Sequence, residues 1–188
     1  MGAQTILYVI LAISAISYLF GQALEYLNLK ALRQDIPEEI ASFYDKEKYL
    51  QSLAYHREQT RFSFLTSAFG FVVSFGMLLF GGFGWTDALL RPYFSHEIPL
   101  ALGFFAVIII GSDLLTLPFQ WHSTFGIEEK YGFNKTTVKT FVMDKLKGYL
   151  LGSLIGGALL ALLIFSINRI GPGFWVWFGL MAAAFVLF

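Results

Sequence analysis

Residues 98–119 read IPLALGFFAVIIIGSDLLTLPF, and this stretch decides the fold class. It contains a single formally charged side chain, Asp113. An α-helix rises about 1.5 Å per residue, so roughly 20 apolar residues cross the ~30 Å hydrocarbon layer of a bilayer. The composition and length of this stretch therefore predict a membrane-spanning helix.

Four other stretches have the same apolar character, which gives five predicted spans: 6–24, 62–83, 98–119, 148–167 and 174–188. Alternation of apolar and polar residues with period two is missing, which argues against an outer-membrane barrel. The sequence therefore predicts an all-α integral membrane protein, a bundle of five transmembrane helices. The fifth span reaches only about 22 Å, so we expect residues 1–188 to be the front part of a longer protein, cut inside this helix.

The overall composition excludes several classes of protein. Hydrophobic residues make up 56% of the chain, charged residues 14%, and the mean hydropathy is +0.64. A soluble domain usually has about 45–50% apolar and roughly 25% charged residues. Thirteen basic residues balance thirteen acidic ones, so there is no excess charge for a nucleic-acid partner. Cysteine is absent, which excludes disulfides, thiolate metal ligands and cysteine nucleophiles.

Basic residues alternate strongly between the segments that connect the spans. None precedes the first span, and the four loops then contain six, one, five and one. Cytoplasmic loops of membrane proteins carry the excess of Lys and Arg. We therefore expect loops one and three to be cytoplasmic and the N-terminus to lie outside.

The first loop has the pattern of an amphipathic cytoplasmic helix. Asp35 is a suitable N-cap and Pro37 suits a first helical turn. Apolar residues then recur at helical spacing from Ile40 to Ala54. We expect one helix from this cap into the second span.

The third loop and the end of the span before it carry the most unusual pattern in the chain. Pro118 is expected to weaken the helix, and Gly126 and Gly132 are expected to allow turns. Thr136 or Thr137 is expected to cap the following helix. These local roles explain no reaction.

This region resembles the CAAX prenyl protease 1-like family of integral-membrane zinc metalloproteases. The shared pattern is LPF, then F-x-I-E-x-x-x-G-F-N-x-x-T, then F-x-x-D-x-x-K. The residues that match it are Leu117, Pro118, Phe119, Phe125, Ile127, Glu128, Gly132, Phe133, Asn134, Thr137, Phe141, Asp144 and Lys147. A weaker match precedes the second span, at Tyr49, Ser52, Tyr55 and Phe62. With the five spans, the resemblance covers essentially the whole chain.

The resemblance implies that the chain is the N-terminal membrane domain of an endopeptidase. In the family, this domain precedes a catalytic half that faces the cytoplasm and holds one zinc through HExxH and a downstream Glu. The implied substrates are prenylated CAAX proteins or, in bacterial relatives, membrane proteins. The implied location is a bacterial inner membrane or a eukaryotic ER-type membrane, with the bilayer and the catalytic domain as partners.

The chain departs from the family where the chemistry takes place. HExxH places two His on one helical face to bind zinc, while its Glu activates the bound water. This chain has only His56, His96 and His122, and Pro99 follows the single His-Glu pair. We therefore assign no catalytic, cofactor-binding or metal-binding residues. Zinc is expected in the missing catalytic domain, and the chain alone is expected to be inactive.

Other functions remain open at this stage. The chain is alternatively a stand-alone, non-catalytic membrane scaffold or partner protein. A small transporter using Asp113 is a further alternative, although no inverted repeat supports it. An intramembrane carboxylate often serves in a proton or ion relay. The structural interpretation is that Asp113 faces the bundle interior and pairs with a polar side chain or lines a watery cavity.

Overall fold

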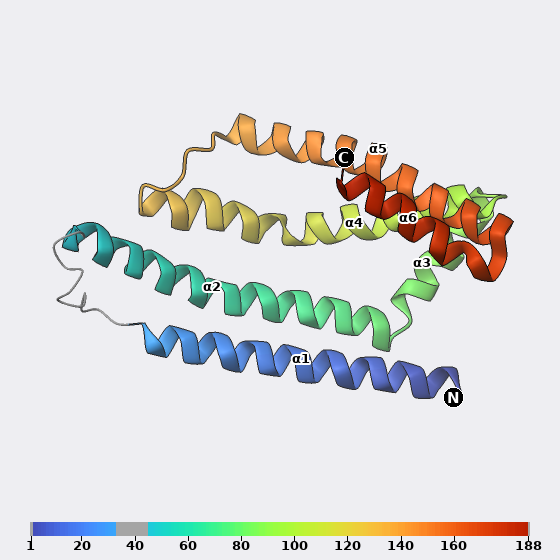
Figure 1. Cartoon of the computed structure of the whole chain (residues 1–188). Coiled ribbons are helices and arrows are strands. Elements are labelled where there is room, and N and C mark those ends of the chain that lie inside the picture. The colour runs from blue at the N-terminus through green and yellow to red at the C-terminus, as the bar shows by residue number, and fades with distance from the viewer. Residues whose placement is uncertain (1, 33–44, 188) are drawn as a thin grey trace. The chain divides into compact units, whose positions relative to one another are not determined.

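A computed structural model describes residues 2–32 and 45–187. This part of the chain is built from helices: α1 (Ala3–Ala31), α2 (Lys46–Leu79), α3 (Gly82–Leu90), α4 (Glu97–His122), α5 (Val138–Ile170) and α6 (Phe174–Leu187) (Figure 1). Three shorter helical segments connect or extend them: η2 (Arg91–Tyr93), the π-helical η3 (Ser123–Glu128) and η4 (Gly171–Gly173). The predicted all-α fold class is confirmed.

The long helices have the length and composition of membrane spans. Four stretches qualify among the described residues: Ala3–Ala31, Lys46–Leu79, Glu97–Glu128 and Val138–Ala184. The last of these contains α5, η4 and most of α6, and therefore both the fourth and the fifth predicted spans. Only two hydrophobic side chains in the described part of the chain are buried, Leu11 and Ile127. An apolar exterior on such long helices is what contact with lipid requires.

The contacts divide the chain into two compact units. The first comprises Met1–Phe83 and Asp113–Lys135, and the second comprises Gly84–Ser112 and Thr136–Phe188. Helix α4 therefore contributes to both units. In the first unit α1 and α2 run antiparallel, side by side (Figure 1). In the second, Asn168 Nδ2 of α5 donates a hydrogen bond to Glu97 Oε2 of α4 at 3.0 Å.

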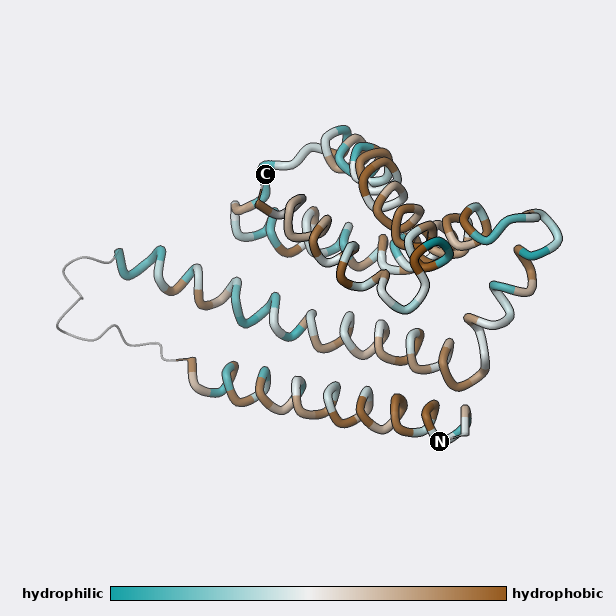
Figure 2. Tube along the Cα trace, turned by 45° about the vertical axis from the view of Figure 1, so that its right-hand side comes forward, coloured by the Kyte–Doolittle hydropathy of each residue, from teal (hydrophilic) through white to brown (hydrophobic). Residues whose placement is uncertain are grey.

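Helix α2 begins later than the sequence predicted. Asp45 has an extended backbone, and its Oδ1 accepts hydrogen bonds from the backbone N–H groups of Glu47 and Lys48 at 3.0 and 3.4 Å. A single helix from Asp35 into the second span is therefore wrong, because Asp45 is itself an N-cap; Asp35 and Pro37 lie outside the described residues. The segment after Asp45 is continuous with the span, and Figure 2 shows α2 changing from hydrophilic to hydrophobic along its length.

The end of α2 also differs from the prediction. The helix stops at Leu79, and Gly81 follows with a φ of +70°. A glycine in this left-handed conformation commonly ends a helix. The nine-residue α3 then occupies what was predicted to be the end of the second span and part of the second loop. Such a short helix leaves too few residues to show helical periodicity in the sequence.

The turn between α5 and α6 depends on the backbone conformation of Gly171. Gly171 has a φ of +66° and a ψ of −139°, a region that side-chain-bearing residues rarely occupy. We expect Gly171→Ala to lower the free energy of unfolding by about 1–3 kcal/mol, measured by denaturant unfolding in detergent. Gly173→Ala is the matched control, because an added Cβ there meets only Ile170 Cγ2 at an ordinary 3.7 Å. Equal stability of the two variants would contradict this account of the turn.

Candidate functional site

The third-loop motif meets α2 in the first structural unit. We call this region the α2–η3 contact: Gln51, Tyr55, Glu58, Gln59 and Phe62 of α2 with Phe119, His122, Ser123, Lys130, Tyr131 and Phe133. Apart from the adjacent pair at 58 and 59, the α2 residues recur at intervals of three or four positions, so they share one helical face. This face presents polar and aromatic groups to the chain that follows α4.

Glu58 is the polar centre of the contact. Its Oε2 accepts hydrogen bonds from Lys130 Nζ at 2.6 Å and from the Tyr131 hydroxyl at 2.7 Å. Gln51 Nε2 donates to the backbone carbonyl of Tyr131 at 2.9 Å. Next to Glu58 on α2, Gln59 Nε2 donates to Ser123 Oγ at 2.9 Å. These bonds attach both η3 and the residues after it to α2.

Two aromatic side chains of α2, Tyr55 and Phe62, form the aromatic part of the contact. Tyr55 packs edge-on against Phe133, with 4.8 Å between ring centroids. Phe62 lies 6.2 Å from Phe119 and 4.9 Å from the His122 ring. Tyr55 and Phe62 belong to the weaker first-loop pattern, and Phe119 and Phe133 belong to the third-loop motif. The structure therefore brings the two patterns into direct contact.

Glu58 also changes the proton affinity of its two partners. Its hydrogen bond with Lys130 raises the pKa of that ammonium above the usual 10.5. Its hydrogen bond with Tyr131 raises the pKa of that phenol above the usual 10.0. In both cases the folded contact favours the protonated partner, because the carboxylate is an acceptor only.

The motif residues divide between the two units. Leu117, Pro118, Phe119, Phe125, Ile127, Glu128, Gly132, Phe133 and Asn134 lie in the first unit, and Thr137, Phe141, Asp144 and Lys147 lie in the second. Ile127 is among the most enclosed of the described residues, with 2% of its surface exposed. Pro118 remains inside α4, and the helical path continues into η3.

The two glycines of the third loop have different roles. Gly132 has a φ of +72°, which confirms the predicted turn, and the N–H groups of Phe133 and Asn134 both donate to Glu128 O. The prediction of a turn at Gly126 is wrong, because this residue lies within η3. A Cβ at Gly126 would lie 3.0 Å from His122 Nδ1, so the glycine leaves room for that ring.

The motif residues of the second unit form the start of α5. Thr137 is the N-cap, as one of the two sequence alternatives predicted, and its Oγ1 accepts from Thr140 N at 3.1 Å. Lys145 Nζ lies 5.5 Å from the centre of the Phe141 ring. Asp144 and Lys147 approach to 3.9 Å on the exposed surface of the helix. The positions of these residues fit local stabilisation of the helix start.

Asp113 has a polar partner on its own helix. Gln120 Nε2 donates to Asp113 Oδ1 at 3.0 Å and to Thr116 Oγ1 at 2.9 Å. The three residues lie on one side of α4, spaced by three, four and seven positions. This arrangement supplies the polar pairing that the structural interpretation of Asp113 requires.

The described residues offer no place for a catalytic metal. Across residues 2–32 and 45–187, no three His, Asp or Glu side chains gather in a way that would hold a metal ion. His122 instead packs on Phe62. In the part of the chain that the structure describes, His122 is thus part of an aromatic contact and not of a cluster of metal ligands.

Sequence reasoning missed most polar residues of the contact. Glu58 and Gln59 were not singled out, although their spacing with Tyr55 and Phe62 places them on the same helical face. The signal that would have found them is the presence of polar residues on the same face of α2 as the aromatic residues Tyr55 and Phe62. Their partners lie more than 60 positions away, at 123 to 131, and a single sequence does not indicate such pairings.

Comparisons with known proteins agree with the motif. A family model described as the CAAX prenyl protease N-terminal region, with five membrane helices, matches residues 25–188. A probable CAAX prenyl protease 1 of Schizosaccharomyces pombe is 32% identical over 170 residues, covering 84% of this chain and 35% of that protein. A CAAX prenyl protease 1 homolog of Oryza sativa subsp. japonica is 30% identical over 190 residues, covering 95% of this chain and 44% of that protein. This chain thus spans less than half the length of either relative.

A solved structure has a similar fold. The crystal structure of S. mikatae Ste24p matches with a TM-score of 0.82 at 24% sequence identity. The match covers 96% of this chain and 43% of the Ste24p chain. Almost the whole chain therefore corresponds to one part of a larger membrane-protein fold.

The Glu58 contact predicts a stability difference that depends on pH. The folded-state pKa values of Lys130 and Tyr131 are raised, so their contribution is fully present below about pH 10 and is lost as pH rises through the folded-state values. We expect Glu58→Gln to lower the melting temperature in detergent between pH 7 and 9. The difference from the unmodified chain should shrink as pH rises through the raised folded-state pKa values of Lys130 and Tyr131.

The matched control is Glu47→Gln, which makes the same charge change on the same helix away from the contact. Its effect on the melting temperature should not vary between pH 9 and 11. A Glu58→Gln difference that stays constant over that range would show that Lys130 and Tyr131 do not act through this carboxylate.

Proposed function

Because the chain belongs to the CAAX prenyl protease family, as its N-terminal membrane domain of five helices, we propose that it forms the membrane wall of a proteolytic compartment. The domain would hold and admit substrate, and a catalytic half outside residues 1–188 would cut it. The proposed substrates are the C-terminal regions of prenylated CAAX proteins or other membrane proteins. The observation that carries the proposal is the family match over residues 25–188.

The α2–η3 contact gives this role a physical basis. Two hydrogen bonds to Glu58 and the aromatic packing of Tyr55 fix the third loop against α2. A loop anchored in this way is a rigid rim at the end of the helices. Rigid positioning of substrate raises the rate of a reaction, and a misplacement of ~1 Å can cost about 100-fold.

The zinc chemistry would belong to the other half of the enzyme. The resemblance implies an HExxH helix there, and a zinc ion bound to it would activate a water molecule for peptide hydrolysis. In this proposal, residues 1–188 contribute no metal ligand and no proton transfer. Their contribution is the shape, polarity and anchoring of the compartment wall.

A chimera tests the proposed role. We would replace the matching 170-residue segment of the S. pombe relative with this chain and measure cleavage of a prenylated CAAX peptide in reconstituted vesicles. We expect activity within about tenfold of the unmodified relative, because greater misplacement of the wall would cost more. This chain alone should give no cleavage above background.

Two controls make the result interpretable. Substituting Ala for the Glu of HExxH in the chimera should abolish cleavage, which excludes a contaminating protease. Thermal unfolding should show that the chimera is folded. A folded, membrane-inserted chimera without activity, beside an active unmodified relative, would overturn the proposed role.

We further propose that the N-terminus lies outside and that loops one and three face the cytoplasm. The distribution of six and five basic residues in these loops supports this orientation. Because the chain has no cysteine, single cysteines report topology without background. A membrane-impermeant maleimide added outside should label His96→Cys and leave Lys135→Cys unlabelled until the membrane is permeabilised. The reverse pattern would invert the topology.

A further inference from the structure

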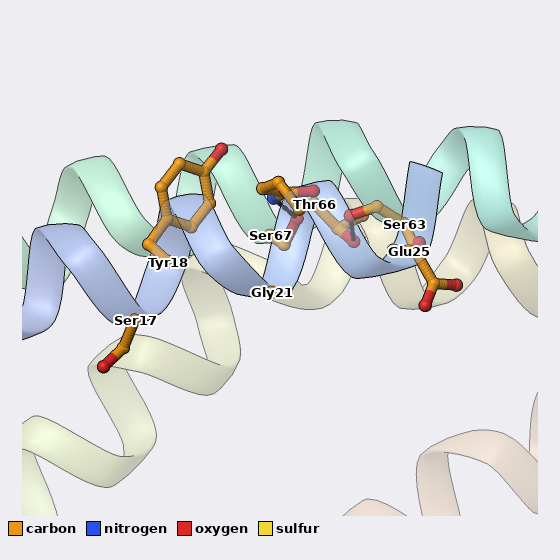
Figure 3. A pocket seen from close by; sticks show the side chains of 8 residues that line it. Ser17, Tyr18, Gly21, Glu25, Ser63, Thr66 and Ser67 are labelled. Carbon is orange, nitrogen blue, oxygen red and sulfur yellow. Dashed lines mark hydrogen bonds between the residues drawn. The ribbon is translucent and has the colours of Figure 1, made fainter. Parts of the chain in front are cut away.

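Helices α1 and α2 line an open groove of about 470 Å³ that contains several polar side chains (Figure 3). Its polar side chains are Ser17, Tyr18, Gln22 and Glu25 of α1 and Ser63, Thr66 and Ser67 of α2. Figure 3 shows these side chains along the line where the two helices meet, with Tyr18 at one end and Glu25 at the other. Both helices are long and apolar enough to span a membrane, so a polar groove between them requires an explanation.

The three hydroxyl groups that α2 contributes to the groove act there as acceptors. Ser63, Thr66 and Ser67 each donate their hydroxyl hydrogen to a backbone carbonyl three residues earlier, at 2.8, 3.1 and 3.2 Å. A hydroxyl has one hydrogen and two lone pairs. Once the hydrogen is used within the helix, the oxygen offers the groove only lone pairs.

The amide of Gln22 adds to this acceptor character. Its Nε2 donates to Ser67 Oγ at 2.6 Å, across the line between the two helices. This bond directs one amide hydrogen onto α2, so one N–H donor and the carbonyl acceptor of the amide remain beside the groove. The groove is therefore rich in acceptors, which favours a ligand that donates hydrogen bonds.

Glu25 gives the groove a negative charge. It is the only charged residue of the lining. Across residues 2–32 and 45–187, no hydrogen bond or ion pair involves its carboxylate. A half-buried carboxylate without a cation is costly, so charge complementarity favours a cationic occupant.

The position of the groove along the helices indicates where the occupant would lie. Glu25 follows the apolar run 6–24 directly, and Ser63 lies at the start of the apolar run 62–83. Figure 2 shows the hydrophilic end of α1 beside the hydrophilic start of α2. The Glu25 end of the groove is thus at the level of lipid headgroups, and the Tyr18 end is deeper.

We propose that the groove binds the headgroup of a phospholipid with a primary ammonium, of the phosphatidylethanolamine class. The three N–H donors of the ammonium would bond to Glu25, the Gln22 carbonyl and the hydroxyl oxygens. A choline headgroup has the same charge but no N–H donor, so it satisfies the carboxylate and leaves the acceptors unpaired. Tyr18, stacked on Phe71 with 4.2 Å between ring centroids, closes the deeper end.

Native mass spectrometry of the whole chain tests this binding. The delipidated protein in detergent would be offered equal amounts of phosphatidylethanolamine and phosphatidylcholine with identical acyl chains. We expect the ethanolamine lipid to be retained about fivefold more than the choline lipid, because hydrogen bonds to a charged group are among the stronger ones. Glu25→Gln should reduce this preference to less than about twofold.

Two further variants separate binding from folding. Thr66→Val keeps the shape of the side chain and removes one acceptor, so it should weaken the preference without unfolding the chain. Glu47→Gln makes the same charge change as Glu25→Gln away from the groove, and it should retain the full preference. Melting temperatures of all variants would be measured in the same detergent.

Several outcomes would overturn the proposal. Equal retention of the two lipids by the unmodified chain would show that the acyl chains alone bind. Stronger retention of an anionic phosphatidylglycerol would contradict the negative charge of the groove. Displacement of the lipid by millimolar free ethanolamine would show that the groove takes a soluble amine. An unchanged preference in a folded Glu25→Gln variant would place the site elsewhere.

Discussion

The constraint on which this structure depends is that hydrocarbon does not form hydrogen bonds. Every backbone N–H and C=O group within a span must find its partner in the chain, and each candidate span of the described chain is accordingly helical. The same constraint acts on side chains. In the described part of the chain, no buried side-chain nitrogen or oxygen lacks a hydrogen-bond partner. Lipid takes the place of a hydrophobic core, since only Leu11 and Ile127 are buried apolar residues there.

Where the helices leave the apolar layer, specific contacts take over from lipid. Glu58 holds Lys130 and Tyr131, and Tyr55 packs on Phe133. Exposed ion pairs contribute little to stability, so the value of this cluster is geometric: it fixes where the third loop lies on α2. The π-helical η3 also belongs to this contact, and it contains Ile127, one of the two buried apolar residues of the described chain. Such turns often occur at functional sites, in agreement with their place inside the family motif.

The sequence was informative where composition alone sets the structure. In the described part of the chain, most of each of the five apolar runs is helical, because a helix satisfies the backbone hydrogen bonds of a long apolar stretch within the stretch itself. Boundaries were less predictable: Asp45 begins α2 through two local hydrogen bonds, and the φ of Gly81 follows its end. The α2–η3 contact was not predictable, since Glu58 and Lys130 are 72 positions apart. Gly126 was misassigned because a glycine that makes room for a ring and one that makes a turn look alike in sequence.

Two polar clusters of the first unit show how the same constraint gives different outcomes. On α4, the amide of Gln120 donates both to Asp113 and to Thr116, so a carboxylate in a span obtains donors from its own helix. Between α1 and α2, the amide of Gln22 donates to Ser67, and the hydroxyl hydrogens of α2 return to its backbone. Acceptors therefore outnumber donors there, and Glu25 adds a charge. A polar cluster in which acceptors outnumber donors favours a hydrogen-bond donor from outside the chain, and at the level of lipid headgroups a lipid ammonium can be that donor.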